Sequence, residues 1–481
     1  MAASAPPAAG LVFLPAPGAG HLASTVEMAK RLVGRFSVIV LTMRPLVPDM
    51  VGPAASSYID SLVSSGLDIR ISELPLVDFP VDPTNRDGVS IFSNFIQAHR
   101  PHVRDAIACL LSSASSPLRI AGIFVDLFST GMIDVGDELG IPTYVYFTSS
   151  AAMLGLMLYQ PTLHEEVPSE MADVEGDIRI PSFAVPIPPL FMPGPMLDKK
   201  SDGYAWFVRH GRRFRSAKGI VVNSFTELET TAAKALTEGR CLPDHATPPI
   251  YLVGPVLSPG SAPPDHECLK WLDRQPPASV VFLCFGSMGS FEKEQLKEIA
   301  LGLERSGHRF LWSLRTRLKG ERFTLPRDAD LGEALPEGFL ERTAGRGLVW
   351  PSWAPQVEVL AHPAVGGFLT HCGWNSTLES VWNGVPTLAW PLYAEQKLNA
   401  HQMVRETGVA VDALGLGSRR DQGAGVVEAA EVERGLRWLM GEEGRKARAR
   451  AAEMKKKSRD AMGEGGSSSL ALERLVESLT R

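Results

Sequence analysis

The stretch from Trp353 to Gln396 constrains the fold more than any other part of this 481-residue chain. A short apolar run at 366–370 leads into the turn-rich segment HCGWNS, and an amphipathic run follows at 377–382. This order predicts a strand, a loop and a helix, with the loop at the carboxyl edge of a parallel sheet. Open α/β sheets bind their ligands at that edge.

The residues around the start of this helix suit an anion. We expect Asn375 and Ser376 to precede the helix, so that their side chains and the N–H groups of its first turn face a ligand, with His371 as a further donor. An alternative is ordinary capping, because Ser376 and Glu379 have the S-x-x-E spacing of a capping box. The two interpretations predict different partners for these side chains.

Aromatic and hydroxyl-reading groups accompany the expected anion site. Trp353 and Trp374 offer indole faces on which a base or a sugar ring can stack. Glu395 and Gln396 follow the apolar run PTLAWPL, so we expect them at the next strand end, where they can hydrogen-bond to sugar hydroxyls. The stretch therefore predicts a site for a sugar nucleotide.

From Trp353 to Gln396 the chain resembles the 44-residue signature segment of the plant secondary-product glycosyltransferases (family 1), which use UDP-sugars. The motifs WAPQ and HCGWNS, the position of Glu379 and the closing Glu-Gln are all in register, and the likeness continues through GHLAS, VNSFTELE, VGPV and FGSM. The resemblance implies an α/β GT-B fold, in which two Rossmann-like domains face each other across a cleft. It places the UDP-sugar mainly on the second domain and the acceptor mainly on the first.

The resemblance also implies roles for single residues in donor binding. Trp353 would stack on uracil with Ala354 and Gln356 nearby, and Glu379 would hold the ribose hydroxyls. The residues expected at the diphosphate are His371, Asn375, Ser376 and Ser287. Those expected at the sugar are Trp374, Tyr393, Glu395 and Gln396.

No metal or other cofactor is implied beside the UDP-sugar. Asp328-Ala329-Asp330 has the D-x-D pattern that other glycosyltransferases use for a metal, but it falls in a charged, irregular stretch at 315–334, and we interpret it as coincidence. The anion site replaces the metal with N–H donors and a helix dipole. Gln396 in the last position resembles glucose users, whereas a histidine there suggests galactose.

The amino-terminal part predicts a βαβ unit. An apolar run at 11–16 precedes GAGH and a helical pattern at 22–33, and a second apolar run follows at 36–43. GAGHLA also fits the dinucleotide pattern G-x-G-x-x-A, which leaves an NADP-dependent oxidoreductase as a remote alternative. Dinucleotide-binding folds usually have an acidic residue after the second strand that binds the ribose hydroxyls. This chain has Arg44 there, which is compatible only with NADP.

Two titratable residues are expected at strand ends of the first domain. We expect His21 on the loop after the first strand, where a neutral imidazole can remove a proton from an acceptor hydroxyl; a capping or loop role is the alternative. Asp126 ends the apolar run IAGIFVD, and a carboxylate there can fix the tautomer of a histidine. The resemblance implies that the two form the catalytic dyad. Some carbon-glycosylating members of the family have the run Asp-Pro-Phe at this place. This chain has Leu127 after Asp126, and the difference favours oxygen acceptors over carbon acceptors.

Composition excludes other classes. A net charge of −6 argues against a nucleic-acid partner, and five scattered cysteines suggest neither a zinc site nor a disulfide framework. The start of the chain lacks the basic region of a signal peptide. The uncharged window 141–159 is interpreted as a strand through Phe147 and a helix from about Ser150, not as a membrane span. We expect a cytoplasmic monomer.

The expected domains are 1–245 for the acceptor, a proline-rich linker at 246–263, 264–460 for the UDP-sugar, and a terminal helix at 461–481 that packs back on the first domain. The basic run 445–459 is interpreted as the solvated face of a helix. The candidates for an apolar acceptor pocket, some from the proline- and methionine-rich loop 160–205, are Phe128, Phe147, Phe183, Phe191 and Met192, with plain core packing as the alternative.

The expected function is inverting transfer of glucose from UDP-glucose to a hydroxyl of a phenol or flavonoid. A terpenoid, hormone or xenobiotic acceptor is an alternative on the same fold. A hydrolase would consume the sugar nucleotide without an acceptor, and a non-catalytic binding module would give no product.

Overall fold

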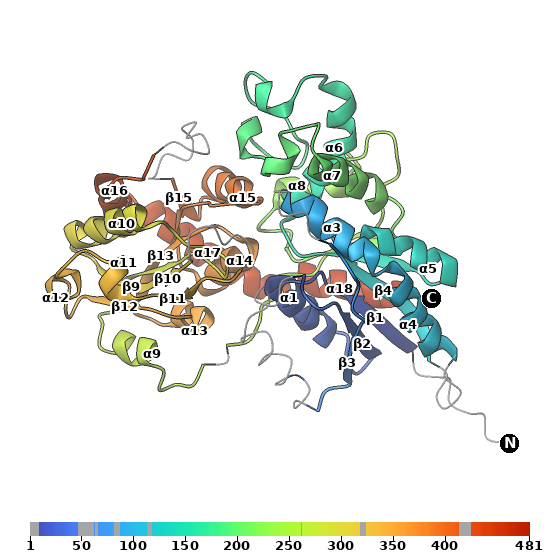
Figure 1. The fold of residues 1–481 in the computed structure, drawn as a ribbon, viewed down its shortest axis with the longest axis horizontal. Helices are drawn as coiled ribbons and strands as arrows, with labels where there is room; N and C mark the ends of the chain where they lie inside the picture. The colour runs from blue at the N-terminus through green and yellow to red at the C-terminus, as the bar shows by residue number, and fades with distance from the viewer. Residues whose placement is uncertain are drawn as a thin grey trace. The chain divides into compact units, whose positions relative to one another are not determined.

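The computed structural model describes residues 9–46, 62, 66–80, 87–112, 118–260, 262–317, 324–412 and 425–481. The chain divides into two compact units, each built on one parallel sheet (Figure 1). The first unit comprises Met1–Pro189, Gly194–Val256 and Ala461–Arg481, and the second comprises Leu190–Pro193 and Leu257–Asp460. The two parallel sheets with their helical crossovers confirm the predicted α/β class.

The first sheet has seven parallel strands in the order β3-β2-β1-β4-β5-β6-β7. Its central strands are apolar runs that are buried along their length, as expected for a parallel sheet covered on both faces. The strands are β1 (Ala9–Leu14), β2 (Ser37–Thr42), β3 (Ile69–Glu73), β4 (Arg119–Asp126), β5 (Thr143–Phe147), β6 (Gly219–Val222) and β7 (Ile250–Leu252). The helices described with it are α1 (Ala19–Lys30), α3 (Gly88–Ala98), α4 (Arg100–Ser112), α5 (Ile133–Leu139), α6 (Ala151–Glu166), α7 (Asp202–Phe214), α8 (Thr230–Thr237) and α18 (Ser467–Thr480).

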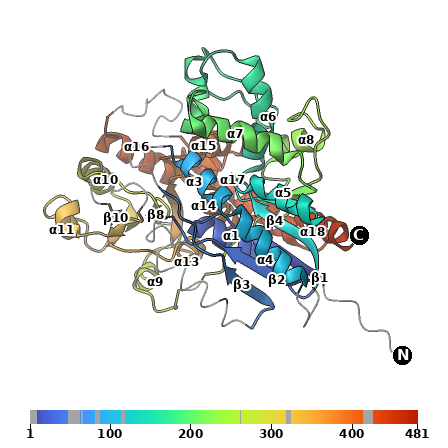
Figure 2. The same cartoon turned by 45° about the vertical axis from the view of Figure 1, so that its right-hand side comes forward.

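The terminal helix α18 lies against the first sheet (Figure 2). Its Ala471, Leu475 and Leu479 join the core formed by α1 and the central strands. Ser478 Oγ also lies 3.0 Å from the hydroxyl of Tyr144 on β5. The spacing of four residues along α18 puts these apolar side chains on one face of the helix, so the last part of the chain completes the core of the first unit.

The uncharged window at 141–159 has the structure predicted for it. β5 ends at Phe147, and α6 begins at Ala151 after Ser150, whose hydroxyl accepts from the N–H of Met153 at 3.1 Å. Throughout the described ranges, no helix combines the length and the apolar character needed to cross a bilayer.

The proline-rich linker contains a strand that the sequence analysis missed. Residues 250–252 form β7, which pairs with β6 at the edge of the first sheet. Three residues flanked by prolines carry too short a pattern to be recognised as a strand. The segment after it is fixed by side chains: Arg31 donates to the carbonyls of Val253 and Pro255 at 2.7 and 2.6 Å, and Asn223 bonds both backbone groups of Val256.

The second sheet has six parallel strands in the order β12-β9-β8-β13-β14-β15. They are β8 (Val280–Cys284), β9 (Arg309–Ser313), β12 (Gly347–Trp350), β13 (Val365–Thr370), β14 (Thr387–Ala389) and β15 (Ala410–Val411), beside a small ribbon of β10 (Arg315–Thr316) and β11 (Arg327–Asp328). The helices are α9 (Glu267–Leu272), α10 (Lys293–Ser306), α11 (Leu331–Ala334), α12 (Phe339–Arg342), α13 (Gln356–Ala361), α14 (Trp374–Asn383), α15 (Gln396–Gln402), α16 (Ala429–Met440) and α17 (Arg445–Met462). A π-helical turn, Met403–Thr407, follows α15.

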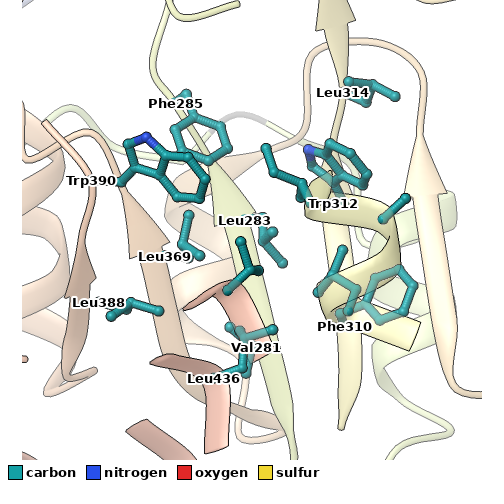
Figure 3. Packing of buried hydrophobic residues seen from close by; sticks show 14 of the residues in the cluster. Val281, Leu283, Phe285, Phe310, Trp312, Leu314, Leu369, Leu388, Trp390 and Leu436 are labelled. Atoms are coloured by element: carbon teal, nitrogen blue, oxygen red, sulfur yellow. The ribbon is translucent and has the colours of Figure 1, made fainter. Parts of the chain in front are cut away.

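Helices cover both faces of the second sheet. Figure 3 shows one face, where Val281, Leu283 and Leu369 of the central strands pack with Leu436 of α16. At the upper end of that view, Phe285 and Trp390 meet edge to face with ring centres 5.9 Å apart. The other face packs against α9 and α13. These two layers hold the carboxyl ends of β8 and β13 in fixed positions.

The two charged stretches are structural elements. Asp330 of the D-x-D pattern caps α11, since its carboxylate accepts from the N–H groups of Gly332 and Glu333 at 2.9 and 3.3 Å. Asp328 lies exposed on β11. The basic run lies within α17, as predicted.

Candidate active site

Each sheet has one point where the strand order reverses, and several of the candidate residues lie at these two points. In the first sheet the chain moves outward from β1 to β3 on one side and from β4 to β7 on the other, so the reversal lies between β1 and β4. In the second sheet it lies between β8 and β13. The crevice at the carboxyl ends of such strand pairs is the usual ligand site of open α/β sheets.

His21 and Asp126 meet at the first of these points. Asp126 is the last residue of β4, and its Oδ2 lies 2.8 Å from Nδ1 of His21. The side chain of Asp126 is completely buried, whereas that of His21 is 28% exposed. His21 is in the first turn of α1 and not on a loop as expected, because extended Gly18 is the N-cap and the helix begins at Ala19. The histidine thus combines a fixed partner with access to solvent.

The contacts of Asp126 determine which imidazole nitrogen can act as a base. Oδ1 accepts from the N–H of Phe128 at 3.1 Å, and Oδ2 faces His21. A carboxylate can only accept, so it holds the proton on Nδ1 and leaves the lone pair on Nε2. The hydroxyl of Thr148, which follows β5, lies 3.2 Å from the same Nδ1. Thr148 was not among the predicted site residues, although its place directly after a strand end could have indicated it.

Two half-buried phenylalanines border His21. The ring of Phe128 lies 5.9 Å and that of Phe92 6.5 Å from the imidazole, centre to centre, and the two phenyl rings meet edge to face at 5.6 Å. Phe128 was a predicted acceptor contact. Phe92 on α3 was not predicted, because an apolar residue in an amphipathic helix usually indicates core packing. Phe147, also predicted, is fully buried on β5 against Phe214 and belongs to the core.

The remaining acceptor candidates are buried elsewhere. Phe191 and Met192, 8% and 2% exposed, lie in the short segment that is counted with the second unit. There the ring of Phe191 contacts His401 with centres 5.6 Å apart. Phe183 is buried as well. The structure therefore brings only Phe128 of the predicted set to His21.

At the second reversal point the helix starts earlier than predicted. α14 begins at Trp374 with Gly373 as its N-cap, so Asn375 and Ser376 lie within its first turn instead of preceding it. The capping box is not formed. Instead, Nε2 of Gln356 donates to Ser376 Oγ at 2.8 Å and to Glu379 Oε2 at 2.7 Å. The N-cap residue Gly373 makes no side-chain cap to α14, and this suits an anion site at the start of the helix.

His371 fills the space between two glycines. A Cβ on Gly286 or on Gly373 would come within 2.4 Å of its Nε2, so both positions require glycine. Burial lowers the pKa of His371 to about 4. The imidazole is therefore neutral at pH 7 and offers a diphosphate one N–H donor without a positive charge.

Glu379 is the titratable group of α14. Desolvation raises the pKa of its carboxyl to about 7, while the hydrogen bond from Gln356 acts in the opposite direction. A half-buried, desolvated carboxylate gains from hydroxyl donors such as those of a ribose.

The two tryptophans of the signature segment differ in accessibility. Trp353 is 49% exposed, which suits stacking, whereas Trp374 is only 3% exposed and offers no free face. The guanidinium of Arg315 lies 4.8 Å from the ring centre of Trp353. Ala354 is buried beside it. Arg315 was missed, because no pattern in the sequence links it to this ring.

The turn after β14 presents the last predicted residues. Oε1 of Gln396, a buried residue, accepts from the N–H groups of Leu392 and Tyr393 at 2.8 and 3.0 Å. Tyr393 is 43% exposed. Ala394, before Glu395, has a φ of 54°, in the left-handed region that non-glycine residues rarely adopt. Such strain often marks a functional site. Ser287 lies partly exposed in the turn that follows β8.

The chain matches known proteins over nearly its whole length. Residues 241–424 match the family described as UDP-glucoronosyl and UDP-glucosyl transferase. The malvidin galactosylase UGT88C3 of Oryza sativa subsp. japonica is 49% identical over 98% of both chains, and the UDP-glucose flavonoid 3-O-glucosyltransferase 6 of Fragaria ananassa is 42% identical over 98% of this chain and 99% of its own. The structure of Phytolacca americana UGT2 with UDP-2fluoro-glucose and pterostilbene has a TM-score of 0.86 at 38% identity, over 98% of this chain and all of that one.

Proposed function

Because the chain belongs to the plant family 1 UDP-glycosyltransferases, we propose that it transfers glucose from UDP-glucose to a hydroxyl of a flavonoid or related phenol, with inversion at the anomeric carbon. Its two parallel α/β units are those of the GT-B fold. Arg44, the residue on which the remote alternative of an NADP-dependent oxidoreductase rests, forms an exposed ion pair with Glu73 at 2.6 Å.

The observation that carries the proposal is the contact between His21 and Asp126. Nε2 of His21 takes the proton of the acceptor hydroxyl, and the resulting oxygen forms a bond to the anomeric carbon. The bond from that carbon to the β-phosphate breaks, and UDP leaves as an anion. Asp126 stabilises the imidazolium that forms.

The second unit supplies the groups for the leaving UDP. The N-terminus of α14 and the turn at Ser287 offer N–H donors to the diphosphate, and Trp353 offers a face to uracil. Because N–H donors and a helix dipole can hold the diphosphate, we propose that the reaction needs no divalent ion. We also propose that the protein acts in the cytosol.

The identity of the sugar rests on Gln396. Because its Oε1 is held by two backbone N–H groups, its Nε2 is the group that can donate to a sugar hydroxyl. Galactose is the second candidate, since the rice relative is named a galactosylase. Competition between carbon-13-labelled UDP-glucose and unlabelled UDP-galactose tests the choice by product mass. An excess of unlabelled product would reverse it.

The acceptor class rests on Phe92 and Phe128. Two half-buried rings beside the base suit a flat aromatic acceptor. A panel of flavonols, anthocyanidins, simple phenols and terpenoids, scored as kcat/KM, tests this. We expect flavonoids to be the best substrates, and a preference for terpenoids would contradict it. Consumption of UDP-glucose without any acceptor would instead indicate a hydrolase.

A further inference from the structure

Arg315 contacts both the base platform and the turn expected at the diphosphate. Its Nη2 donates to the carbonyls of Gly286 and Ser287 at 3.0 and 2.7 Å, and its guanidinium lies 4.8 Å from the ring centre of Trp353. The side chain is half-buried on β10. One planar group thus joins two parts of the chain that are more than sixty residues apart.

We call residues 286–288 the diphosphate turn. Arg317 donates to its third carbonyl, that of Met288, at 2.9 Å. In a planar trans peptide, the C=O and the following N–H point in opposite directions. The carbonyls that bind Arg315 therefore direct the N–H groups of Ser287 and Met288 away from the arginine. Gly286, with a φ of +74°, permits the tight bend that this arrangement needs.

Trp353 is held in the same way. The guanidinium covers one face of the indole, yet 49% of the residue surface stays exposed. A planar ring has a second face, which remains for a base. The guanidinium therefore fixes the orientation of the platform without occupying it.

We propose that Arg315 is a positioning residue for the donor: it fixes the indole of Trp353 and the N–H groups of the diphosphate turn as one preorganised unit for the uracil and the phosphates. This inference rests on the proposed function. It predicts that Arg315 acts through geometry, because a planar fork can hold two carbonyls and stack on a ring, whereas a lysine ammonium is a point charge that cannot do both.

The test compares Arg315→Lys and Arg315→Gln with the wild-type protein by calorimetry, using UDP and uridine as ligands. We expect the UDP dissociation constant to rise about tenfold in both variants, and the ratio of the uridine to the UDP constant to fall, since the phosphates lose their preorganised donors. Arg342→Gln is the matched control, because Arg342 lies on α12 and pairs with Glu304 at 2.6 Å. It should bind both ligands as the wild-type protein does.

A double-mutant cycle with Trp353→Ala separates positioning from simple loss of stability. If Arg315 acts through the indole that it fixes, its effect on uridine binding shrinks when Trp353→Ala is already present. Additive effects would overturn the inference. So would UDP binding at wild-type strength by Arg315→Lys, because charge alone would then suffice.

Folding and function are checked separately. Thermal unfolding shows whether each variant is folded at the assay temperature, and Arg315→Lys carries the test if Arg315→Gln is not. If the wild-type protein fails to bind UDP, the proposed function is wrong. If it binds UDP and both Arg315 variants bind equally well, only this inference is wrong.

Discussion

The two units use the same topological position in different ways. At the reversal between β1 and β4, the first unit places one titratable pair, His21 and Asp126. At the reversal between β8 and β13, the second unit places a helix N-terminus and a neutral histidine between glycines, and an exposed indole follows the edge strand β12. In the function we propose, chemistry is concentrated in the first unit, and donor recognition is distributed over many contacts in the second.

This difference predicts how each unit responds to substitution. A proton acceptor cannot be replaced by its neighbours, so one change in the first unit should remove the reaction and leave donor binding intact. When several contacts each contribute a little binding free energy, the loss of one lowers affinity only in part, so single changes in the second unit should weaken UDP binding without abolishing turnover.

His21→Ala should have the largest effect. Removing the base is expected to lower kcat by about 10²- to 10⁴-fold, while the UDP dissociation constant stays within about twofold of wild type, since no donor contact is lost. Product formation with a flavonol and calorimetry with UDP measure the two quantities.

His245→Ala is the control for that experiment, because His245 is an exposed histidine of the same unit. It should retain full activity. Turnover of His21→Ala at the wild-type rate with ordinary phenols would show that His21 is not the base. A large loss of UDP affinity in the same variant would show that the first unit also contributes to donor binding.

Gly373→Ala should have the largest effect in the second unit. The new Cβ would lie 2.4 Å from Nε2 of His371, and the buried ring must move. Overpacking of this kind costs about 1 to 3 kcal/mol, and a cost of that size in the donor site predicts a UDP dissociation constant about 5 to 150 times higher. Calorimetry with UDP measures it.

A matched control is Gly307→Ala, which strains a left-handed residue with open space around it and lies away from His371. It should lower the melting temperature without changing UDP affinity. If both glycine variants weaken UDP binding equally, the loss reflects general instability and not the fit of His371.

Glu379→Gln should have a smaller, pH-dependent effect. The carboxyl pKa is raised from 4.5 to about 7 in the folded protein, so the folded state holds a proton that the unfolded state releases. The stability from this group is present below pH 4.5 and is lost as the pH rises to about 7. The glutamine variant stays neutral, so it should exceed the wild type in stability at pH 8 by about 1 to 2 kcal/mol, allowing for partial exposure.

The same variant should bind UDP less well if Glu379 holds the ribose. Denaturant unfolding at pH 5 and pH 8, together with calorimetry, gives both numbers. An unchanged UDP dissociation constant would return Glu379 to a purely structural role, and an equal stability difference at the two pH values would show that its carboxyl does not titrate as described.

The sequence predicted the elements that one continuous segment forms, and it did not predict contacts between distant segments. The strand, turn and helix around HCGWNS follow from the local pattern. The predicted helix start was too late, because the glycine at 373 indicated a longer turn. Phe92 and Arg315 reach the two sites from other elements, and no local pattern marks such contacts. The pairing of His21 with Asp126 joins residues 105 positions apart. Only the family resemblance connected them before the structure did.

Asp330→Ala should have the smallest effect and tests whether the second unit works without a metal. Because Asp330 caps α11, its loss should cost about 1 kcal/mol of stability and lower the melting temperature by a few degrees at most. A metal ligand would behave differently: kcat/KM would fall sharply, and EDTA would inhibit the wild-type protein. We expect unchanged kcat/KM in the variant and unchanged wild-type activity in EDTA. A fall of kcat/KM in the variant would make the D-x-D pattern part of the donor site. Inhibition of the wild-type protein by EDTA would show that N–H donors alone do not account for diphosphate binding.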